Sequence, residues 1–144
     1  MSEPKTNIVV IADEHDLIFY LSNLLKIYGF EPLVVGQWKE ALAAAHRTRP
    51  ALVVMDAMLA GHVAQQAYSG LKHHEILGRV PVLMLSSLTR RSLSRFYVNP
   101  SGGMNRRLPE PDAVLPRPPE ADEFIAAVRE LCATSICSEE AKPS

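Results

Sequence analysis

Short apolar runs alternate with amphipathic stretches along this chain of 144 residues. The runs 8–11, 52–55 and 80–85 are almost continuously apolar, which is typical of parallel strands covered on both faces. Between them, apolar residues recur every three or four positions, which predicts helices with one buried side. The pattern therefore predicts an α/β protein in which strands and helices alternate.

Capping residues, prolines and glycines indicate where the helices and strands end. Asp16 is expected to cap the start of the first helix and Gly29 its end. Pro32 places the second strand at an edge, because proline cannot donate to an interior ladder. Gly70 is expected to break or fray a helix. The expected strands are 8–11, 30–35, 52–56, 80–85 and 113–115, and the expected helices are 17–28, 39–47, 64–77, 90–98 and 120–132.

Five strands alternating with five helices predict a doubly wound, five-stranded parallel sheet. The edge position of the second strand suits the order 2-1-3-4-5, so we expect a flavodoxin-like three-layer sandwich. The length predicts one domain. We assign residues 1–133 to this domain and residues 134–144 to a C-terminal tail or linker stub.

Composition narrows the class of protein without naming a function. A formal charge of -1 and a pI near 6.5 make nucleic acid or an anionic membrane an unlikely partner. The chain has no signal-like N-terminus and no apolar stretch approaching about 18 residues, so a cytoplasmic location is expected. Only Cys132 and Cys137 are present, which fits a reducing compartment and supplies no zinc quartet.

Polar residues follow the apolar runs at the predicted carboxyl ends of the strands, where open parallel sheets place their ligands. Asp13, Asp56 and Ser86 follow the first, third and fourth strands, and Arg117 follows the fifth. Two carboxylates, a backbone carbonyl and waters could bind Mg²⁺. A carboxylate can accept a phosphoryl group, and a hydroxyl and a cation could bind its oxygens. The pattern therefore predicts a phosphoryl-acceptor site.

Three segments, in the same order, resemble the receiver domain of two-component response regulators. They are the first strand with its acids, the strand and loop around Asp56, and the fourth strand ending in a hydroxyl, at 8–14, 50–61 and 80–87. The resemblance covers about residues 7–131.

This resemblance implies roles for individual residues. Asp56 would be the phosphoacceptor, Ser86 the switch hydroxyl and Arg117 the cation that pairs with the acceptor and the phosphate. Asp13, Asp56 and the backbone carbonyl of Met58 would hold Mg²⁺, and Glu14 could contribute. The donor would be a sensor histidine kinase or a phosphotransferase, the target an unidentified downstream protein, and the domain itself would not be an enzyme.

The chain departs from the family pattern at functional positions. Ala12 stands where a second acid is usual, so Mg²⁺ affinity should fall. Arg117 replaces a lysine, and the planar guanidinium is not equivalent to an ammonium. Val114 replaces the aromatic residue that moves on activation, and Ala60 replaces a common loop proline.

The segment between Ser86 and Arg117 is longer than the family usually has. Within it, residues 89–108 hold five arginines and no acid, and this run could dock an acidic partner, touch nucleic acid or form a solvated mobile loop. Three functions stay open: a phosphorylated receiver, a receiver-like module that binds partners without phosphorylation, and a flavodoxin-type ligand binder. We rank them in that order. The ligand binder comes last because the acidic loop after the first strand repels phosphate without a metal.

Overall fold

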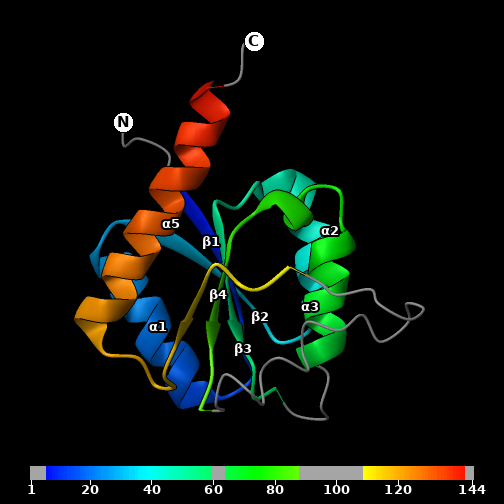
Figure 1. Cartoon of the computed structure of the whole chain (residues 1–144). Coiled ribbons are helices and arrows are strands. Elements are labelled where there is room, and N and C mark those ends of the chain that lie inside the picture. The colour runs from blue at the N-terminus through cyan, green and yellow to red at the C-terminus, as the bar shows by residue number, and fades with distance from the viewer. Residues whose placement is uncertain (1–5, 60–63, 88–108, 142–144) are drawn as a thin grey trace.

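The computed structural model describes residues 6–59, 64–87 and 109–141. Within these ranges five parallel strands form one sheet in the order β2-β1-β3-β4-β5, which confirms the predicted topology (Figure 1). The strands are β1 (Thr6–Ile11), β2 (Phe30–Val35), β3 (Leu52–Asp56), β4 (Val82–Leu85) and β5 (Ala113–Leu115). The helices are α1 (His15–Ile27), α2 (Trp38–Thr48), α3 (Ala64–His73), the 3-10 turn η2 (Leu77–Arg79) and α5 (Ala121–Ala141).

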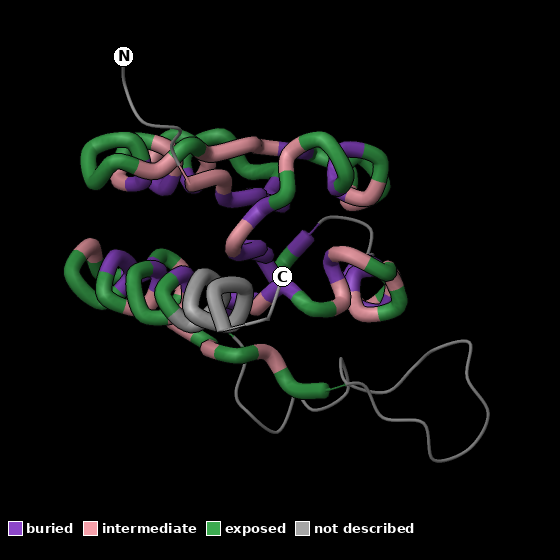
Figure 2. The backbone as a smooth tube through the Cα atoms, turned by 90° about the horizontal axis from the view of Figure 1, so that it is seen from above, coloured by how far each residue is buried: buried purple, intermediate pink, exposed green. Residues whose placement is uncertain are grey.

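Helices cover both faces of the sheet, as the continuous apolar runs predict. Helices α1 and α5 lie on one face and α2 and α3 on the other (Figure 1). Alternate β1 residues serve the two cores: Ile8 and Val10 pack with α1 and α5, whereas Val9 and Ile11 pack with α2 and α3. Figure 2 shows the buried strands between the two layers of helices. The result is the three-layer sandwich expected from the sequence.

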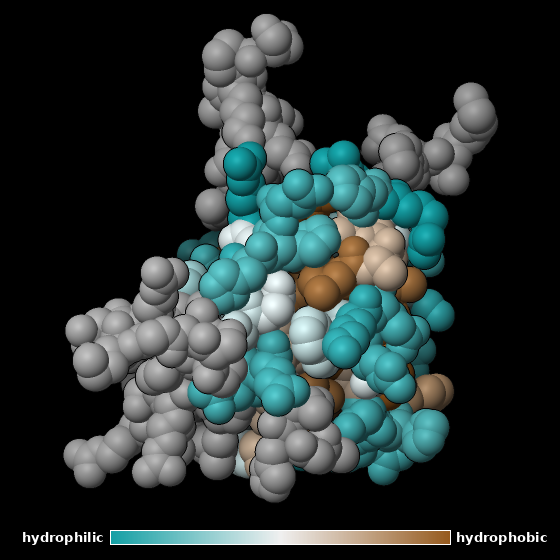
Figure 3. Space-filling model, turned by 90° about the vertical axis from the view of Figure 1, so that its right-hand side faces the viewer, coloured by the Kyte–Doolittle hydropathy of each residue, from teal (hydrophilic) through white to brown (hydrophobic). Residues whose placement is uncertain are grey.

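The surface of the α2 and α3 side is mostly hydrophilic around a smaller apolar area (Figure 3). Among the described residues, no helix combines the length and apolar character needed to cross a membrane.

The first helix begins two residues earlier than expected. Glu14 is its N-cap, with extended backbone angles, and Asp16 lies in the first turn, so the prediction that Asp16 caps this helix is wrong. The end agrees with the sequence, since Gly29 follows Tyr28 at a φ of 89°, where glycine is favoured.

Helix α3 continues through Gly70 without a break, contrary to the expectation from sequence. Because Gly70 has no side chain, the ring of Trp38 from α2 can pack directly against it. A Cβ at Gly70 would come within 2.8 Å of Trp38 Cη2. Close helix packing, rather than a helix break, explains this glycine. The helix does end early, at His73, and the 3-10 turn follows it.

Helix α5 is longer than expected and ends at Ala141 instead of residue 132. The assignment of residues 134–144 to a tail or linker stub stays a prediction. The expected helix at 90–98, the arginine-containing segment 89–108 and Ala60 lie outside the described residues.

Candidate functional site

The carboxyl edge of the sheet brings together the polar residues predicted from the strand ends. Asp56 is the last residue of β3, and Asp13 follows β1, its neighbour in the sheet. Ser86 directly follows β4, whose residue Leu85 is paired with Asp56. Arg117 lies two residues after β5. Parallel register therefore delivers four chemically useful side chains to one edge of the sheet.

Asp56 is almost completely buried, with 1% of its surface exposed. Its Oδ1 accepts a hydrogen bond of 2.8 Å from the backbone N–H of Met58. The Nε of Arg117 lies 3.1 Å from Oδ1 and 3.2 Å from Oδ2. Burial raises the pKa of Asp56 above its ordinary value, against the opposing effects of the Met58 N–H and the Arg117 charge. The carboxylate is thus desolvated but held by two donors.

Arg117 contacts a second carboxylate with the other end of its guanidinium. Its Nη2 donates to Glu14 Oε2, so one cation bridges Asp56 and Glu14. Burial opposes the charged form, yet the two carboxylates together raise the pKa of Arg117. The Arg117 side chain is 22% exposed and that of Glu14 51% exposed. The bridge runs from the buried Asp56 towards solvent.

Ser86 is buried next to this group, with 5% exposure. Its backbone N–H donates to the carbonyl of Leu115 at 3.0 Å, and the N–H of Ala57 donates to the carbonyl of Leu85 at 2.9 Å. These bonds extend the pairing of β3, β4 and β5 past the ends of the strands. Ser86 is therefore bonded to β5, and the residue before it is bonded to the segment that follows β3.

The oxygen atoms at this edge fit a magnesium ion that keeps much of its water. Asp13 is close enough for its charge to raise the pKa of Asp56, and the Met58 carbonyl belongs to the same loop. Magnesium is commonly held by one or two carboxylates with waters completing the octahedron. The described residues contain no cluster of three or more His, Cys, Asp or Glu side chains suited to a metal. Ala12 is buried in the core and adds no ligand, and Glu14 is engaged by Arg117.

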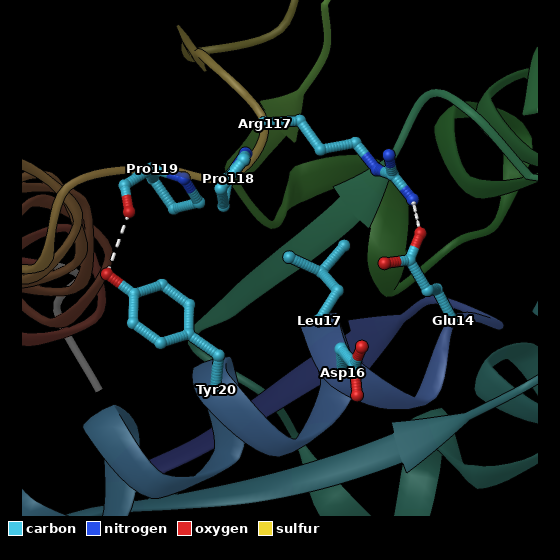
Figure 4. Close-up of a pocket in the computed structure, with 7 residues that line it drawn as sticks. All are labelled: Glu14, Asp16, Leu17, Tyr20, Arg117, Pro118 and Pro119. Atoms are coloured by element: carbon cyan, nitrogen blue, oxygen red, sulfur yellow. Dashed lines mark hydrogen bonds and ion pairs between the residues drawn. The ribbon is translucent and has the colours of Figure 1, made fainter.

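A pocket of about 440 Å³ opens beside Arg117, between α1 and the β5–α5 loop (Figure 4). The Tyr20 hydroxyl donates to the carbonyl of Pro119 at 2.8 Å and ties the loop to α1. Sequence reasoning missed this contact and the pairing of Glu14 with Arg117, because 99 and 103 residues separate the partners. The pocket is lined by Glu14, Asp16, Leu17, Tyr20, Arg117, Pro118 and Pro119.

Comparison with known proteins shows which sequences the chain resembles. The chain is 32% identical over 92 residues to the DNA-binding response regulator MtrA of Mycolicibacterium smegmatis, covering 62% of this chain and 38% of that protein. It is 33% identical over 82 residues to the sensory transduction protein RegX3 of the same organism, covering 57% and 35%. The chain thus spans less than two fifths of the length of these relatives. No family model matches it.

Solved structures agree on the fold. A putative response regulator from Chloroflexus aurantiacus superposes with a TM-score of 0.72 at 19% identity, covering 90% of this chain and 99% of the other. The receiver domain of a Pseudomonas aeruginosa sensor histidine kinase, with magnesium coordinated in its active-site cleft, gives 0.71 at 18% identity, with coverage of 90% and 99%. The chain therefore has the fold of response regulator receiver domains, and part of its sequence is similar to that of response regulators.

The receiver keeps the order of its site residues while changing their chemistry. Arg117 reaches Asp56 directly, so the cation expected beside the acceptor is present as a guanidinium. Val114 is 39% exposed on β5, at the position expected to carry an aromatic residue. The edge of the sheet therefore carries the predicted site residues together with a guanidinium and a β5 surface that differ from the expected pattern.

Proposed function

We propose that this receiver accepts a phosphoryl group on Asp56 from the phosphohistidine of a histidine kinase or phosphotransferase. The supporting observation is the setting of Asp56. A buried carboxylate at the end of β3 has a guanidinium within 3.2 Å of both its oxygens, and Ser86 follows the adjacent strand. The combination of nucleophile, cation and hydroxyl is suited to phosphoryl transfer.

In the proposed step, a carboxylate oxygen of Asp56 forms a bond to the donor's phosphorus. The P–N bond breaks, and its electron pair returns to the imidazole of the donor histidine. The product is an acyl phosphate on Asp56. The carboxylate must be ionised to attack, and the Met58 N–H and Arg117 favour that form against the effect of burial.

The other site residues stabilise the charge that develops on the transferred group. Arg117 and the Ser86 hydroxyl would bind phosphoryl oxygens through charge-assisted and neutral hydrogen bonds. Asp13, Asp56 and the Met58 carbonyl would hold Mg²⁺. When bound, the ion offsets negative charge on the phosphoryl group.

The proposed output is a change in binding to a downstream protein. Ser86 is positioned to transmit the change, because its backbone is bonded to Leu115 of β5. Movement of Ser86 towards a phosphoryl group would therefore act on β5 and the surface around Val114. The matched relatives include DNA-binding regulators, but this chain spans 38% of their length. That nucleic acid is an unlikely partner of this chain, and that the chain acts in the cytoplasm, stay predictions.

The test is modification of Asp56 in solution. The protein is incubated with Mg²⁺ and acetyl phosphate, and the intact mass is measured. We expect the added mass of one phosphoryl group, which disappears in Asp56→Asn. Asp122→Asn, in the first turn of α5, is the matched control and should be modified like the parent.

Beryllofluoride provides a second readout of the same site. It should alter the spectrum of the parent protein and not that of Asp56→Asn. A folded protein that responds to neither reagent at millimolar Mg²⁺ would refute phosphorylation and leave the phosphorylation-independent interaction module. A flavin or nucleotide that copurifies would favour a ligand binder instead.

A further inference from the structure

We propose that Glu14 is a positioning residue that anchors the outer end of Arg117 and thereby holds the guanidinium against Asp56. The proposal rests on the phosphoacceptor function proposed for Asp56. The pattern of polar residues at strand ends does not predict this role for Glu14, because the role depends on a contact between residues 103 positions apart in the chain.

The geometry divides the guanidinium between two acceptors. Nε faces both oxygens of Asp56, and Nη2 donates to Glu14. A planar fork can serve two carboxylates in fixed directions, whereas an ammonium is a single point charge. The arginine at position 117 and the acid at position 14 therefore form one unit: the second acceptor gives the longer side chain a defined position.

Glu14 is well placed to act as a fixed anchor. Its backbone is the N-cap of α1, and its carbonyl accepts the N–H of Ile18 at 3.0 Å. Its side chain makes no capping hydrogen bond and extends instead to Arg117 (Figure 4). The positive end of the helix dipole favours a carboxylate at this position. The backbone of Glu14 is thus held at the start of α1, and its carboxylate carries the charge that binds Arg117.

The backbone that carries Arg117 is attached to the same helix. The Tyr20 hydroxyl on α1 donates to the Pro119 carbonyl two residues beyond Arg117. The outer end of the Arg117 side chain and the loop that carries Arg117 are therefore both tied to α1 or its N-cap, as Figure 4 shows. Without Glu14, the outer part of the arginine side chain would gain rotamer freedom and spend less time against Asp56.

The test compares Glu14→Gln, which keeps the shape and removes the charge, with Glu14→Asp, which keeps the charge on a shorter side chain. We expect Glu14→Gln to slow the modification of Asp56 by acetyl phosphate by about fivefold, consistent with loss of one partly exposed charge-assisted bond. Glu14→Asp should recover part of the rate. Asp16→Asn removes a neighbouring acid of the same pocket and is the matched control.

A double-mutant cycle with Arg117→Lys separates positioning from direct metal binding by Glu14. A lysine cannot bridge two carboxylates as the fork does, so Glu14→Gln should cause little further loss of rate in the Arg117→Lys protein. If Glu14 were a metal ligand, the loss would persist in that background and the affinity for Mg²⁺ would fall. Persistence of the loss would overturn the proposal, as would a faster reaction of Glu14→Gln.

A readout without phosphoryl transfer keeps the two proposals distinguishable. In the parent protein, the Nε–H of Arg117 should give a protected NMR signal, assigned by its loss in Arg117→Lys. Glu14→Gln should shift this signal and increase its exchange with water, and Asp16→Asn should not. A parent protein that is not phosphorylated refutes the acceptor function alone. An Arg117 signal that is unchanged in Glu14→Gln refutes the positioning role, whatever the phosphorylation result.

Discussion

The Nε of Arg117 lies 3.1 Å from Oδ1 of Asp56, although 61 residues separate them in the chain. The contact joins a carboxylate without exposed side-chain surface to a guanidinium that is 22% exposed. The cation beside Asp56 is therefore a side chain that also contacts solvent and a second carboxylate, that of Glu14. Several measurable properties of the receiver depend on this arrangement.

Replacing Arg117 by methionine should raise the pKa of Asp56 further. The substitution removes the cation that favours the carboxylate, while burial and the charge of Asp13 continue to disfavour it. The measurement is a pH titration of the Asp56 side-chain carbonyl carbon by NMR. Arg129→Met is the control, because Arg129 stacks on Tyr28 instead. An Asp56 titration that does not move in Arg117→Met would show that the contact is not populated in solution.

Asp56→Asn should stabilise the receiver at neutral pH, by on the order of 1 kcal/mol, because an amide loses less on burial than a carboxylate. The pKa of Asp56 is raised from 3.8 in the folded state, so the folded protein binds this proton more readily than the unfolded chain. The cost of ionising Asp56 is therefore absent below 3.8. It grows as the pH rises towards the folded-state pKa and is complete above it.

Urea unfolding of both proteins at neutral pH and below pH 3.8 measures this linkage. The advantage of Asp56→Asn should shrink at the lower pH, where the parent carboxyl is protonated. A constant difference at both pH values would mean that the effect of the substitution is unrelated to ionisation.

Ala12→Asp should strengthen Mg²⁺ binding. It adds a carboxylate beside Asp13 at the edge of the sheet, where the present oxygen donors are few. We expect the Kd for Mg²⁺ to fall about tenfold, which corresponds to about 1.4 kcal/mol. Ala12 is 1% exposed, so the variant should also be less stable. Calorimetric titration compares it with Ala12→Asn, which has a similar shape and no charge; equal Mg²⁺ affinities would contradict the prediction.

Gly70→Ala should destabilise the receiver by about 2 kcal/mol, because the added methyl group overlaps the ring of Trp38. Trp38 is the single tryptophan of the chain, so its fluorescence should also shift if the ring is displaced. Gly36→Ala is the matched control, since a Cβ there meets nothing within 4 Å. Urea unfolding followed by Trp38 fluorescence measures both effects, and equal stability of the two variants would refute the packing role of Gly70.

The architecture, and the meeting of polar residues at one edge of the sheet, can be predicted from the sequence alone. Apolar runs and helical spacing encode which segments are strands and helices, and Pro32 marks the edge strand β2. Parallel strands end at a common edge, so the sequence predicts that Asp13 and Asp56 lie at the same edge of the sheet. These features are local or follow from the topology, and for this reason they can be predicted from the sequence.

The contacts that individual side chains make depend on the tertiary structure. Helix α3 continues through Gly70, and the ring of Trp38 occupies the space that a side chain would take there. Local helix propensity cannot predict this contact. Glu14, not Asp16, is the N-cap of α1, and its carboxylate binds Arg117. Such contacts depend on where distant segments meet after the chain has folded. The grouping of Asp13 and Asp56 at one edge could thus be predicted from the sequence, whereas the cation bridge between Asp56 and Glu14 depends on the packed β5–α5 loop.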